Sequence, residues 1–152
     1  MILYSKGDLL KADVEALVNA VNCVGVMGKG IALQFKQAFP GNFKAYEQAC
    51  KQGKVKLGTM HVYETGLPSN PKYIINFPTK QHWKDKSDLQ DVKDGLENLI
   101  SVVQELNIKL IAIPPLGCGL GGLKWSDVQP LIENAFQKDK GVTATIYLPR
   151  EE

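Results

Sequence analysis

Two stretches decide the fold of this chain: Gly25-Val26-Met27-Gly28-Lys29-Gly30, the first glycine loop, and Gly117-Cys118-Gly119-Leu120-Gly121-Gly122, the second glycine loop. Each follows a short apolar run typical of a buried strand. Backbone without side chains lets several amide N–H groups approach phosphate oxygens, and a helix after such a loop adds its positive dipole end. The pair therefore predicts a cradle for a diphosphate and hence nucleotide binding. For either loop alone, a tight strand-to-helix turn is the alternative interpretation.

Length and composition are typical of one globular domain, which we expect over residues 1–152. A further domain downstream of this sequence stays an open question. Three scattered cysteines and two histidines indicate neither a disulfide framework nor a metal site, and they favour a reducing, cytoplasmic compartment. Charged residues near the start and the lack of a long apolar run predict a soluble chain without a signal peptide or membrane span. The net charge of +2 neither favours nor excludes a nucleic acid partner.

Short apolar runs rich in β-branched and aromatic residues alternate with amphipathic helical patterns along the chain. Such alternation predicts an α/β fold in which helices cover both faces of a sheet and ligands bind beyond the carboxyl ends of its strands. Both glycine loops are expected at such ends. The predicted strands are residues 2–4, 16–19, 61–63, 73–77, 110–114 and 143–148.

The helical patterns have visible starts and breaks. A helix in two parts is predicted after the first glycine loop, with the break at Pro40-Gly41. A longer helix is expected over 89–106, and a last one has its apolar stripe over 128–136. Ser87 and Ser126 are each followed three residues later by Gln, which is the spacing of a capping box, so both are predicted helix caps.

Two nucleotide-binding motifs are matched only in part. A P-loop needs glycine where Cys23 stands and Ser or Thr where Gly30 stands, so ATPase chemistry is disfavoured. The second glycine loop matches G-x-G-x-x-G, but it comes late in the chain, and Leu123-Lys124-Trp125 separates it from the expected helix cap. It therefore lacks the context of a Rossmann dinucleotide-binding unit.

Polar residues lie at the ends of the first two predicted strands. Asn19 and Asn22 flank the exit of the second strand, and an amide can hydrogen-bond a sugar hydroxyl without bringing charge. The alternative for Asn22 is an Asx turn that stabilises the strand exit. Asp8 can accept a hydrogen bond from an adenine amino group, and its alternative is a cap for the helical turn at Leu9-Leu10.

Four segments together resemble the macrodomain family: Lys6-Gly7-Asp8-Leu9-Leu10, Asn19-Ala20-Val21-Asn22, Gly25-Val26-Met27-Gly28-Lys29-Gly30-Ile31-Ala32 and Pro115-Leu116-Gly117-Cys118-Gly119-Leu120-Gly121-Gly122-Leu123. The resemblance covers nearly the whole chain. It implies a three-layer α/β/α sandwich with a central mixed sheet of about six strands, and ADP-ribose as the ligand. The Val-Met-Gly-Lys-Gly form of the first loop and Asn76-Phe77-Pro78-Thr79-Lys80 resemble the DarG branch, whose members remove ADP-ribose from thymidine in DNA modified by DarT toxins.

The resemblance implies a role for each matching residue. Lys80 and Asn22 are the implied catalytic residues, with Lys80 near the anomeric carbon and Asn22 orienting the distal ribose. Asp8 and Leu9 are expected to meet the adenine, and the two loops to hold the diphosphate and distal ribose. The implied ADP-ribose-binding residues are Asp8, Leu9, Asn19, Gly25, Val26, Met27, Gly28, Lys29, Gly30, Ile31, Thr79, Leu116, Gly117, Cys118, Gly119, Leu120, Gly121, Gly122 and Leu123.

The implied activity is that of a hydrolase, a DNA ADP-ribosyl glycohydrolase that serves as antitoxin to a DarT-type ADP-ribosyltransferase. The expected partners are ADP-ribosylated single-stranded DNA, ADP-ribose and a DarT-type toxin, with no membrane. A monomer is expected, with no cofactor and no metal, since ADP-ribose is ligand and product. Two alternatives remain: a non-catalytic ADP-ribose reader, and a hydrolase of ADP-ribose esters on protein glutamate.

Lys80 distinguishes an enzyme from a reader. A lysine acts as a nucleophile only when deprotonated, which desolvation or a nearby cation favours, and otherwise it stabilises negative charge. The alternative for a lysine here is a solvated surface residue. The glutamate-directed relatives carry an acid where this chain has Gly121, which favours the DNA-directed branch. No general acid is identified, because His82 is interpreted as a loop residue, and covalent attack and water attack both stay open.

Lysines surround an aromatic pair after the fourth predicted strand. Lys80, Lys84 and Lys86 flank His82 and Trp83. Basic residues interleaved with an aromatic can follow phosphates and stack a base of single-stranded DNA. The alternative is a solvated loop whose tryptophan packs locally.

Overall fold

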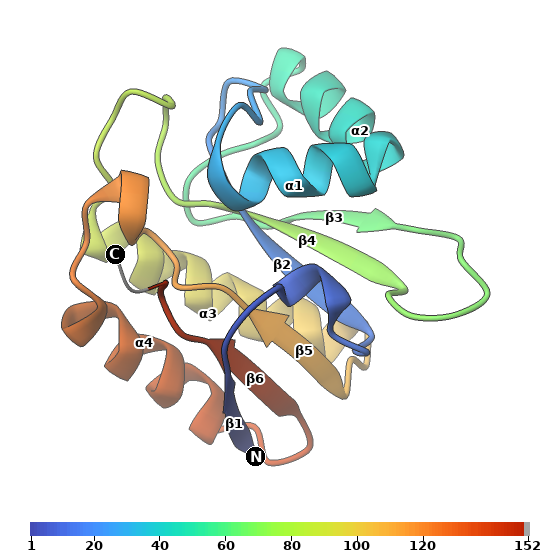
Figure 1. Ribbon diagram of the computed structural model, residues 1–152, viewed down its shortest axis with the longest axis vertical. Coiled ribbons are helices and arrows are strands. Elements are labelled where there is room, and N and C mark those ends of the chain that lie inside the picture. The colour runs from blue at the N-terminus through green and yellow to red at the C-terminus, as the bar shows by residue number, and fades with distance from the viewer. Residues whose placement is uncertain (151–152) are drawn as a thin grey trace.

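Six strands form one mixed sheet within residues 1–150, the part of the chain that the computed structural model describes (Figure 1). Their order is β1-β6-β5-β2-β4-β3, and β3 runs antiparallel to β4 while the other neighbours are parallel. The predicted strands are confirmed, each within two residues of the observed bounds. These are β1 (Ile2–Ser5), β2 (Ala16–Val21), β3 (His61–Glu64), β4 (Tyr73–Pro78), β5 (Leu110–Ile113) and β6 (Thr143–Tyr147).

Apart from the buried amides Asn19 and Asn76, the central strands β2, β4 and β5 are apolar because both of their faces are covered. Successive residues of a strand point to opposite faces of a sheet. On β2, Leu17 belongs to the core cluster that contains Phe35, whereas Ala16 and Val18 belong to the cluster that contains Leu99. A continuous apolar run is therefore what a strand between two helical layers requires.

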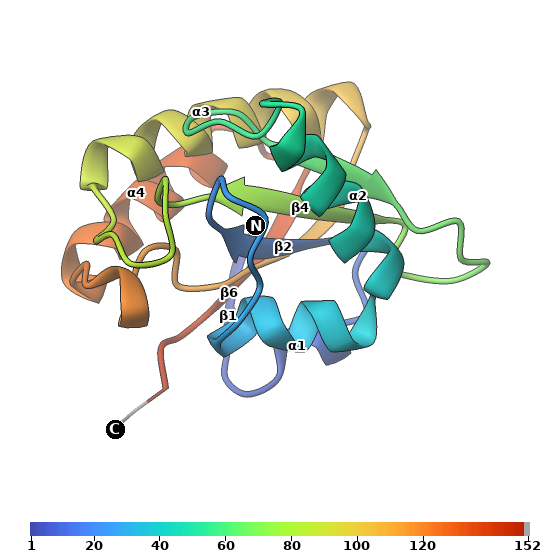
Figure 2. The same cartoon turned by 90° about the horizontal axis from the view of Figure 1, so that it is seen from above.

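Helices lie on both faces of this sheet (Figure 2). On one face are α1 (Gly30–Ala38) and α2 (Pro40–Lys51), and on the other are α3 (Leu89–Glu105) and α4 (Trp125–Gln137). Short 3-10 turns are η1 (Leu9–Lys11) and η2 (Gly119–Gly121). The α/β/α layers are thus confirmed, as is the break in the first helix, since Pro40 takes the first position of α2, where its missing N–H costs nothing. Within residues 1–150, no helix combines the length and apolarity needed to cross a membrane.

Both predicted serine caps are wrong by one or two positions. Asp88 caps α3, and its Oδ1 accepts a hydrogen bond from the first-turn backbone at 2.8 Å. The N–H of Ser87 donates instead to Gly121 O at 2.9 Å, a contact with a distant part of the chain. The last helix begins at Trp125, so Ser126 already lies within its first turn. In the first case a tertiary contact outweighs the local capping signal, since the Ser87 backbone is held by the second glycine loop.

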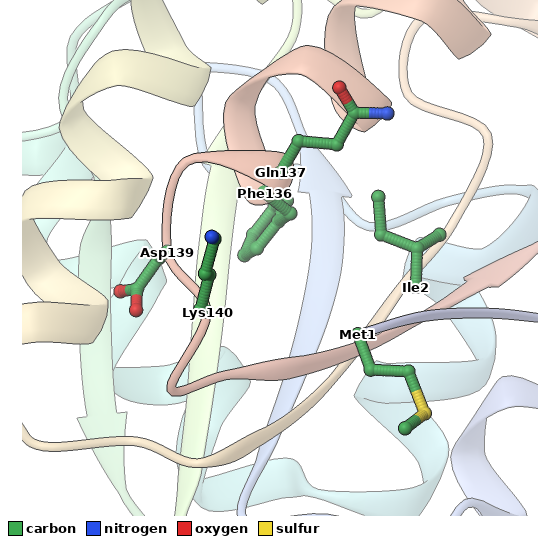
Figure 3. Close-up of a pocket in the computed structure, with 6 residues that line it drawn as sticks. All are labelled: Met1, Ile2, Phe136, Gln137, Asp139 and Lys140. Carbon is green, nitrogen blue, oxygen red and sulfur yellow. The ribbon is translucent and has the colours of Figure 1, made fainter.

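The two ends of the sheet differ sharply. The carboxyl ends of β5, β2 and β4 are neighbours, with β2 between the two other strands. The ends of β2 and β5 lead into the two glycine loops, and the end of β4 leads into the segment before α3. Parallel α/β sheets bind ligands at such a position. At the amino ends lies an open hollow of about 320 Å³ (Figure 3). It contains none of the predicted site residues; its lining is Met1, Ile2, Phe136, Gln137, Asp139 and Lys140.

Gly95 gives a test of how tightly α3 packs on the sheet. A methyl group at Gly95 would fall onto the ring of Phe77, which is wholly buried. Replacing glycine with alanine within an exposed helix stabilises it by about 1 kcal/mol. We expect Gly95→Ala to do the opposite and to lower the free energy of unfolding by about 1–3 kcal/mol, because overpacking outweighs propensity. Urea unfolding measures this change.

Ser101→Ala, at an exposed position of the same helix, is the control and should change stability by less than about 0.5 kcal/mol. A Gly95→Ala protein as stable as the wild type would contradict the close contact with Phe77.

Candidate functional site

Three segments meet where the central strands end. The first glycine loop follows β2, residues 80–87 (the lysine segment) follow β4, and the second glycine loop follows β5. The three strands are neighbours in the sheet, so segments far apart in sequence come together at one edge (Figure 1). The sequence prediction that both glycine loops share this edge is confirmed.

The lysine segment bridges the two glycine loops through the backbone. Near its start, Gln81 O accepts a hydrogen bond from Cys23 N at 2.9 Å, next to the first loop. At its end, Ser87 N donates to Gly121 O at 2.9 Å. Both ends of the segment are therefore held, and the side chains between them project from a fixed base.

Asn22 organises the first glycine loop. Its Oδ1 accepts hydrogen bonds from Val24 N at 3.0 Å and from the hydroxyl of Tyr46 at 2.7 Å, while its Nδ2 donates to Val26 O at 2.8 Å. Tyr46 is wholly buried, and burial raises its pKa, so it remains a hydroxyl donor. The Asx-turn interpretation of Asn22 is confirmed. Its role in orienting a ribose stays a prediction.

A buried amide network lies beneath the first loop. Asn76 Oδ1 accepts from Asn19 Nδ2 at 3.2 Å and from Asn42 Nδ2 at 3.3 Å. Asn76 Nδ2 donates to Asn42 Oδ1 at 2.8 Å and lies 3.0 Å from His61 Nδ1. The imidazole Nδ1 is then an acceptor, which requires a neutral ring, and burial lowers the pKa of His61 in agreement. These contacts couple β4, α2 and β3 directly below the loop.

Asn19 lies beneath the first glycine loop, and its predicted contact with ADP-ribose stays a prediction. Asn19 is wholly buried, and its Nδ2 lies 3.8 Å from the sulfur of Met27, which is also buried. Both side chains thus support the loop from below and do not line its outer surface. The sequence places Asn19 correctly at the strand end but does not reveal that it faces the interior.

Exposure divides the remaining loop residues into two groups. Buried residues shape the loops from within: Gly25, Leu116, Gly117 and Gly121. Exposed residues form the outer surface: Val26, Gly28, Lys29, Gly30, Gly119, Leu120 and Gly122. Ile31, Cys118 and Leu123 are partly buried. Burial raises the pKa of the Cys118 thiol, which keeps it protonated and argues against a nucleophilic role.

The second glycine loop closes around Ser87. Gly117 and Gly122 have φ values of +74° and +80°, and Leu123 N donates to Gly117 O at 3.0 Å. A Cβ atom at Gly121 would lie 2.5 Å from Ser87 Oγ and 3.1 Å from Ser87 Cβ. A side chain at position 121, acidic or not, therefore requires Ser87 to move from this arrangement.

The first helical turn holds the residues predicted to meet adenine. Asp8 caps this turn, its Oδ1 accepting from Leu10 N at 3.0 Å, so the capping interpretation is confirmed. Asp8 is exposed, whereas the side chain of Leu9 is buried in the core. A ligand at Leu9 would therefore meet its backbone, and adenine recognition by either residue stays a prediction.

The start of α1 favours an anion. This helix begins at Gly30, directly after the first glycine loop, and no side chain caps it. Its first turn contains no acidic residue. The first N–H groups of a helix lack partners within the helix and carry the positive end of its dipole. The geometry thus suits a phosphate group.

Lys80 stands at the start of the lysine segment. The preceding residue, Thr79, is buried and continues the sheet by donating from its N–H to Val21 O at 2.9 Å. The ammonium of Lys80 donates to Trp83 O at 3.0 Å. Burial, and then the positive charge of Lys86, lower the pKa of Lys80. The shift enlarges the fraction of neutral amine near neutral pH.

His82 makes its contacts within the lysine segment. Its N–H donates to Asp85 Oδ2 at 3.0 Å, and its Nδ1 lies 3.1 Å from Lys84 N, which donates to it. Its ring lies 5.1 Å from that of Trp83. These contacts agree with the interpretation of His82 as a loop residue. Among residues 1–150, no group of three or more His, Cys, Asp or Glu side chains is placed to hold a metal ion.

The comparison with protein families agrees with this geometry. The Macro domain model matches residues 18–132, which include both glycine loops and Lys80. The chain is a macrodomain. Its predicted family is therefore confirmed, and the α/β/α layers with loops at the carboxyl edge belong to the family fold.

Relatives with solved structures resemble this macrodomain closely. The macrodomain of Mycobacterium tuberculosis DarG is 58% identical, with a TM-score of 0.98 over 99% of both chains. The macrodomain of Thermus aquaticus DarG is 50% identical, with a TM-score of 0.95 over 98% of this chain and 99% of that one. Thermosipho africanus DarTG, solved in complex with ADP-ribose, is 34% identical, with a TM-score of 0.91 over 99% of this chain and 42% of that one.

Curated relatives extend beyond this macrodomain. The M. tuberculosis protein named DNA ADP-ribosyl glycohydrolase is 58% identical over 149 residues, which cover 98% of this chain and 42% of the relative. This chain therefore spans about two fifths of the length of that relative.

Sequence reasoning missed the supporting roles of four residues around the site. The sequence predicts Tyr46 only as part of an apolar helix face, because nothing in the sequence shows that its hydroxyl contacts Asn22. Ser87 was interpreted as a helix cap, whereas it holds the second glycine loop. Asn42 has no signal in the sequence, and Asn76 belongs to the segment that resembles the DarG branch, but nothing in the sequence shows that the two amides pair.

The contact between Gly121 and Ser87 can be measured with a double-mutant cycle. We expect Gly121→Ala to destabilise the protein by about 1–3 kcal/mol, because the new Cβ strikes Ser87 Oγ. In a Ser87→Ala background the nearest atom is the Ser87 Cβ at 3.1 Å, so the same change should cost about 1 kcal/mol less. Urea unfolding of the four proteins gives the coupling energy.

Gly119→Ala is the matched control in the same loop, because a Cβ there meets no atom within 4 Å although its φ of +66° adds backbone strain. Its cost should not depend on Ser87. Equal costs of Gly121→Ala in both backgrounds would contradict the steric contact.

Proposed function

We propose that this macrodomain is a DNA ADP-ribosyl glycohydrolase, which releases mono-ADP-ribose from modified thymidine in single-stranded DNA. The observation that carries the proposal is Lys80, a lysine of lowered pKa held between the two glycine loops. The names of relatives 50–58% identical to this chain support it. The fusion of transferase and glycohydrolase in the Thermosipho africanus relative supports a DarT-type toxin as the partner.

The loops supply binding in this proposal. The uncapped start of α1 and the exposed backbone of both glycine loops receive the diphosphate of ADP-ribose. Asn22 holds the first loop in shape through Val24 and Val26, and Asp8 lies where adenine is expected. The anomeric carbon of the distal ribose then lies near Lys80.

Lys80 supplies the chemistry. A neutral amine can attack the anomeric carbon, or it can take a proton from a water that attacks this carbon, and both routes require the deprotonated form. In either route the bond from ribose to thymine breaks, and the base leaves with the bonding electrons and takes up a proton. In the first route water then hydrolyses the lysine adduct, so that ADP-ribose is released. Lys80 Nζ donates one N–H to Trp83 O, and the lone pair of the neutral amine stays available for the reaction. The ester-directed alternative is disfavoured because Ser87 occupies the space that an acidic side chain at Gly121 would need.

Release of ADP-ribose from an oligonucleotide tests the proposal. We expect the wild-type chain to release ADP-ribose from a thymidine oligonucleotide modified by a DarT-type transferase. Lys80→Ala should slow this release by at least about 100-fold, the usual contribution of a positioned acid or base, while the affinity for free ADP-ribose changes little. Lys93→Ala, an exposed lysine on α3, is the control and should be fully active.

Two outcomes would overturn the proposal. Tight ADP-ribose binding without release from DNA by the wild type would identify a reader, or an ester hydrolase if a glutamate-linked substrate is cleaved instead. Full activity of Lys80→Ala would remove Lys80 from the chemistry.

The pH dependence of kcat/KM tests the charge state of Lys80. The rate should rise with pH as the amine loses its proton, because the neutral form reacts. Lys86→Gln removes a like charge, which raises the pKa of Lys80 and moves this rise to higher pH. Asp85→Asn removes an opposite charge, which lowers that pKa and moves the rise to lower pH. Shifts of both variants in one direction would contradict the assignment.

A further inference from the structure

We propose that Trp83 is a stacking platform for a base next to the modified thymidine, with Lys84 beside it to meet the DNA backbone. The inference deepens the proposed function and rests on it, because it assigns the surface that receives the DNA strand itself. It names a contact to the polynucleotide that is separate from the contacts to ADP-ribose.

The position of Trp83 follows from the fixed ends of the lysine segment. Gln81 is bonded to the exit of β2 and Ser87 to the second glycine loop, so the residues between them form an arch over the carboxyl edge of the sheet. Figure 1 shows this arch as the yellow-green loop that leads from β4 to α3. Trp83 lies near its middle. A polymer attached to the reacting carbon near Lys80 must leave the site past this arch.

The indole of Trp83 is 47% exposed, although a tryptophan side chain is usually well buried. The ring of His82 lies 5.1 Å from it and tilted by 31°, and the ammonium of Lys84 lies 5.0 Å from its centroid. These neighbours lie against the ring and orient it on the arch, and a stacking base would displace the flexible Lys84 side chain, which lies over the ring. Local packing, the alternative interpretation from the sequence, therefore accounts for only about half of the surface of Trp83.

The chemistry around Trp83 fits single-stranded nucleic acid. Bases stack on exposed aromatic rings whatever their identity, and nearby cations contact the phosphates between them. Trp83 supplies the ring, and Lys84 and Lys86 supply exposed cations on the same arch. Asp85, which also lies here, is engaged with the N–H of His82. A ring and cations in this order match one strand of DNA better than an acidic protein surface, which would need no aromatic platform.

Lys80 contacts the main chain of Trp83 and not its side chain. The chemical role of Lys80 and the stacking role of Trp83 can therefore be tested separately. The ammonium of Lys80 bonds the carbonyl oxygen of Trp83 and makes no use of the indole. Removing the indole ring therefore leaves the carbonyl oxygen that accepts the hydrogen bond from Lys80 in place. A change at Trp83 can thus alter DNA affinity while the chemistry at Lys80 continues.

The decisive experiment compares two substrates: ADP-ribosylated thymidine within a single-stranded oligonucleotide, and the same modified thymidine as an isolated nucleotide. For Trp83→Ala we expect KM for the oligonucleotide to rise about tenfold, the scale of one lost stacking contact, with kcat within about twofold. KM for the isolated nucleotide and the Kd of free ADP-ribose should not change. Trp83→Phe should recover most of the oligonucleotide affinity.

Leu67→Ala is the matched control, because Leu67 is also 47% exposed but lies in the β3–β4 connection, away from the glycine loops. It should leave all these constants unchanged. Binding of the modified oligonucleotide is also measured in the Lys80→Ala background, with and without Trp83→Ala, so that the platform can be assessed without turnover.

The outcomes distinguish the two proposals. Equal oligonucleotide KM and Kd for wild type and Trp83→Ala would overturn the platform, even if Lys80-dependent release continues, and would point to a protein partner for the exposed indole. Absence of release by the wild type would overturn the proposed hydrolase. In that case a Trp83-dependent loss of oligonucleotide affinity would still support the platform.

Discussion

Backbone hydrogen bonds from Cys23 N to Gln81 O and from Ser87 N to Gly121 O join three loops that lie far apart in the sequence. Each loop follows a different strand, and without these bonds each would be an independent surface turn. Because main-chain groups make the contacts, the arrangement tolerates variation in most of the side chains that the loops display. The two backbone bonds also fix the surroundings of Lys80. Partial burial and the neighbouring Lys86 on the same segment lower the pKa of Lys80.

Support for the first glycine loop comes from polar groups within the interior. A buried polar atom without a partner costs about 1–3 kcal/mol. Most amide groups of this network are placed against one another, and the Oδ1 of Asn19 is the exception among them. Asn76 exchanges hydrogen bonds with Asn42, and Tyr46 donates to Asn22, so α2 and β4 are both tied to the strand exit. Polar networks of this kind specify one arrangement more strictly than apolar contacts do. The loop is thereby shaped before any ligand arrives.

Glycine has two separate uses in the second loop. Gly117 and Gly122 adopt positive φ values that side chains disfavour, whereas Gly121 is required because Ser87 lies against it. The same contact that holds the lysine segment in place thus removes the room for an acidic side chain. Gly121 and Ser87 thus link the shape of the second glycine loop to the position of the lysine segment.

The order of strands and helices, the two glycine loops and their common edge were predictable from sequence, because they depend on local periodicity and on glycine backbone freedom. The resemblance of the segment ending at Lys80 to the DarG branch directed attention to the lysine that the structure holds beside both glycine loops. Tertiary structure alone decided that Asn19 faces the interior, that Tyr46 holds Asn22, and that Ser87 closes a loop where a helix cap was expected. The physical reason is that hydrogen-bond partners and desolvation depend on atoms from distant segments, whose placement no local pattern contains.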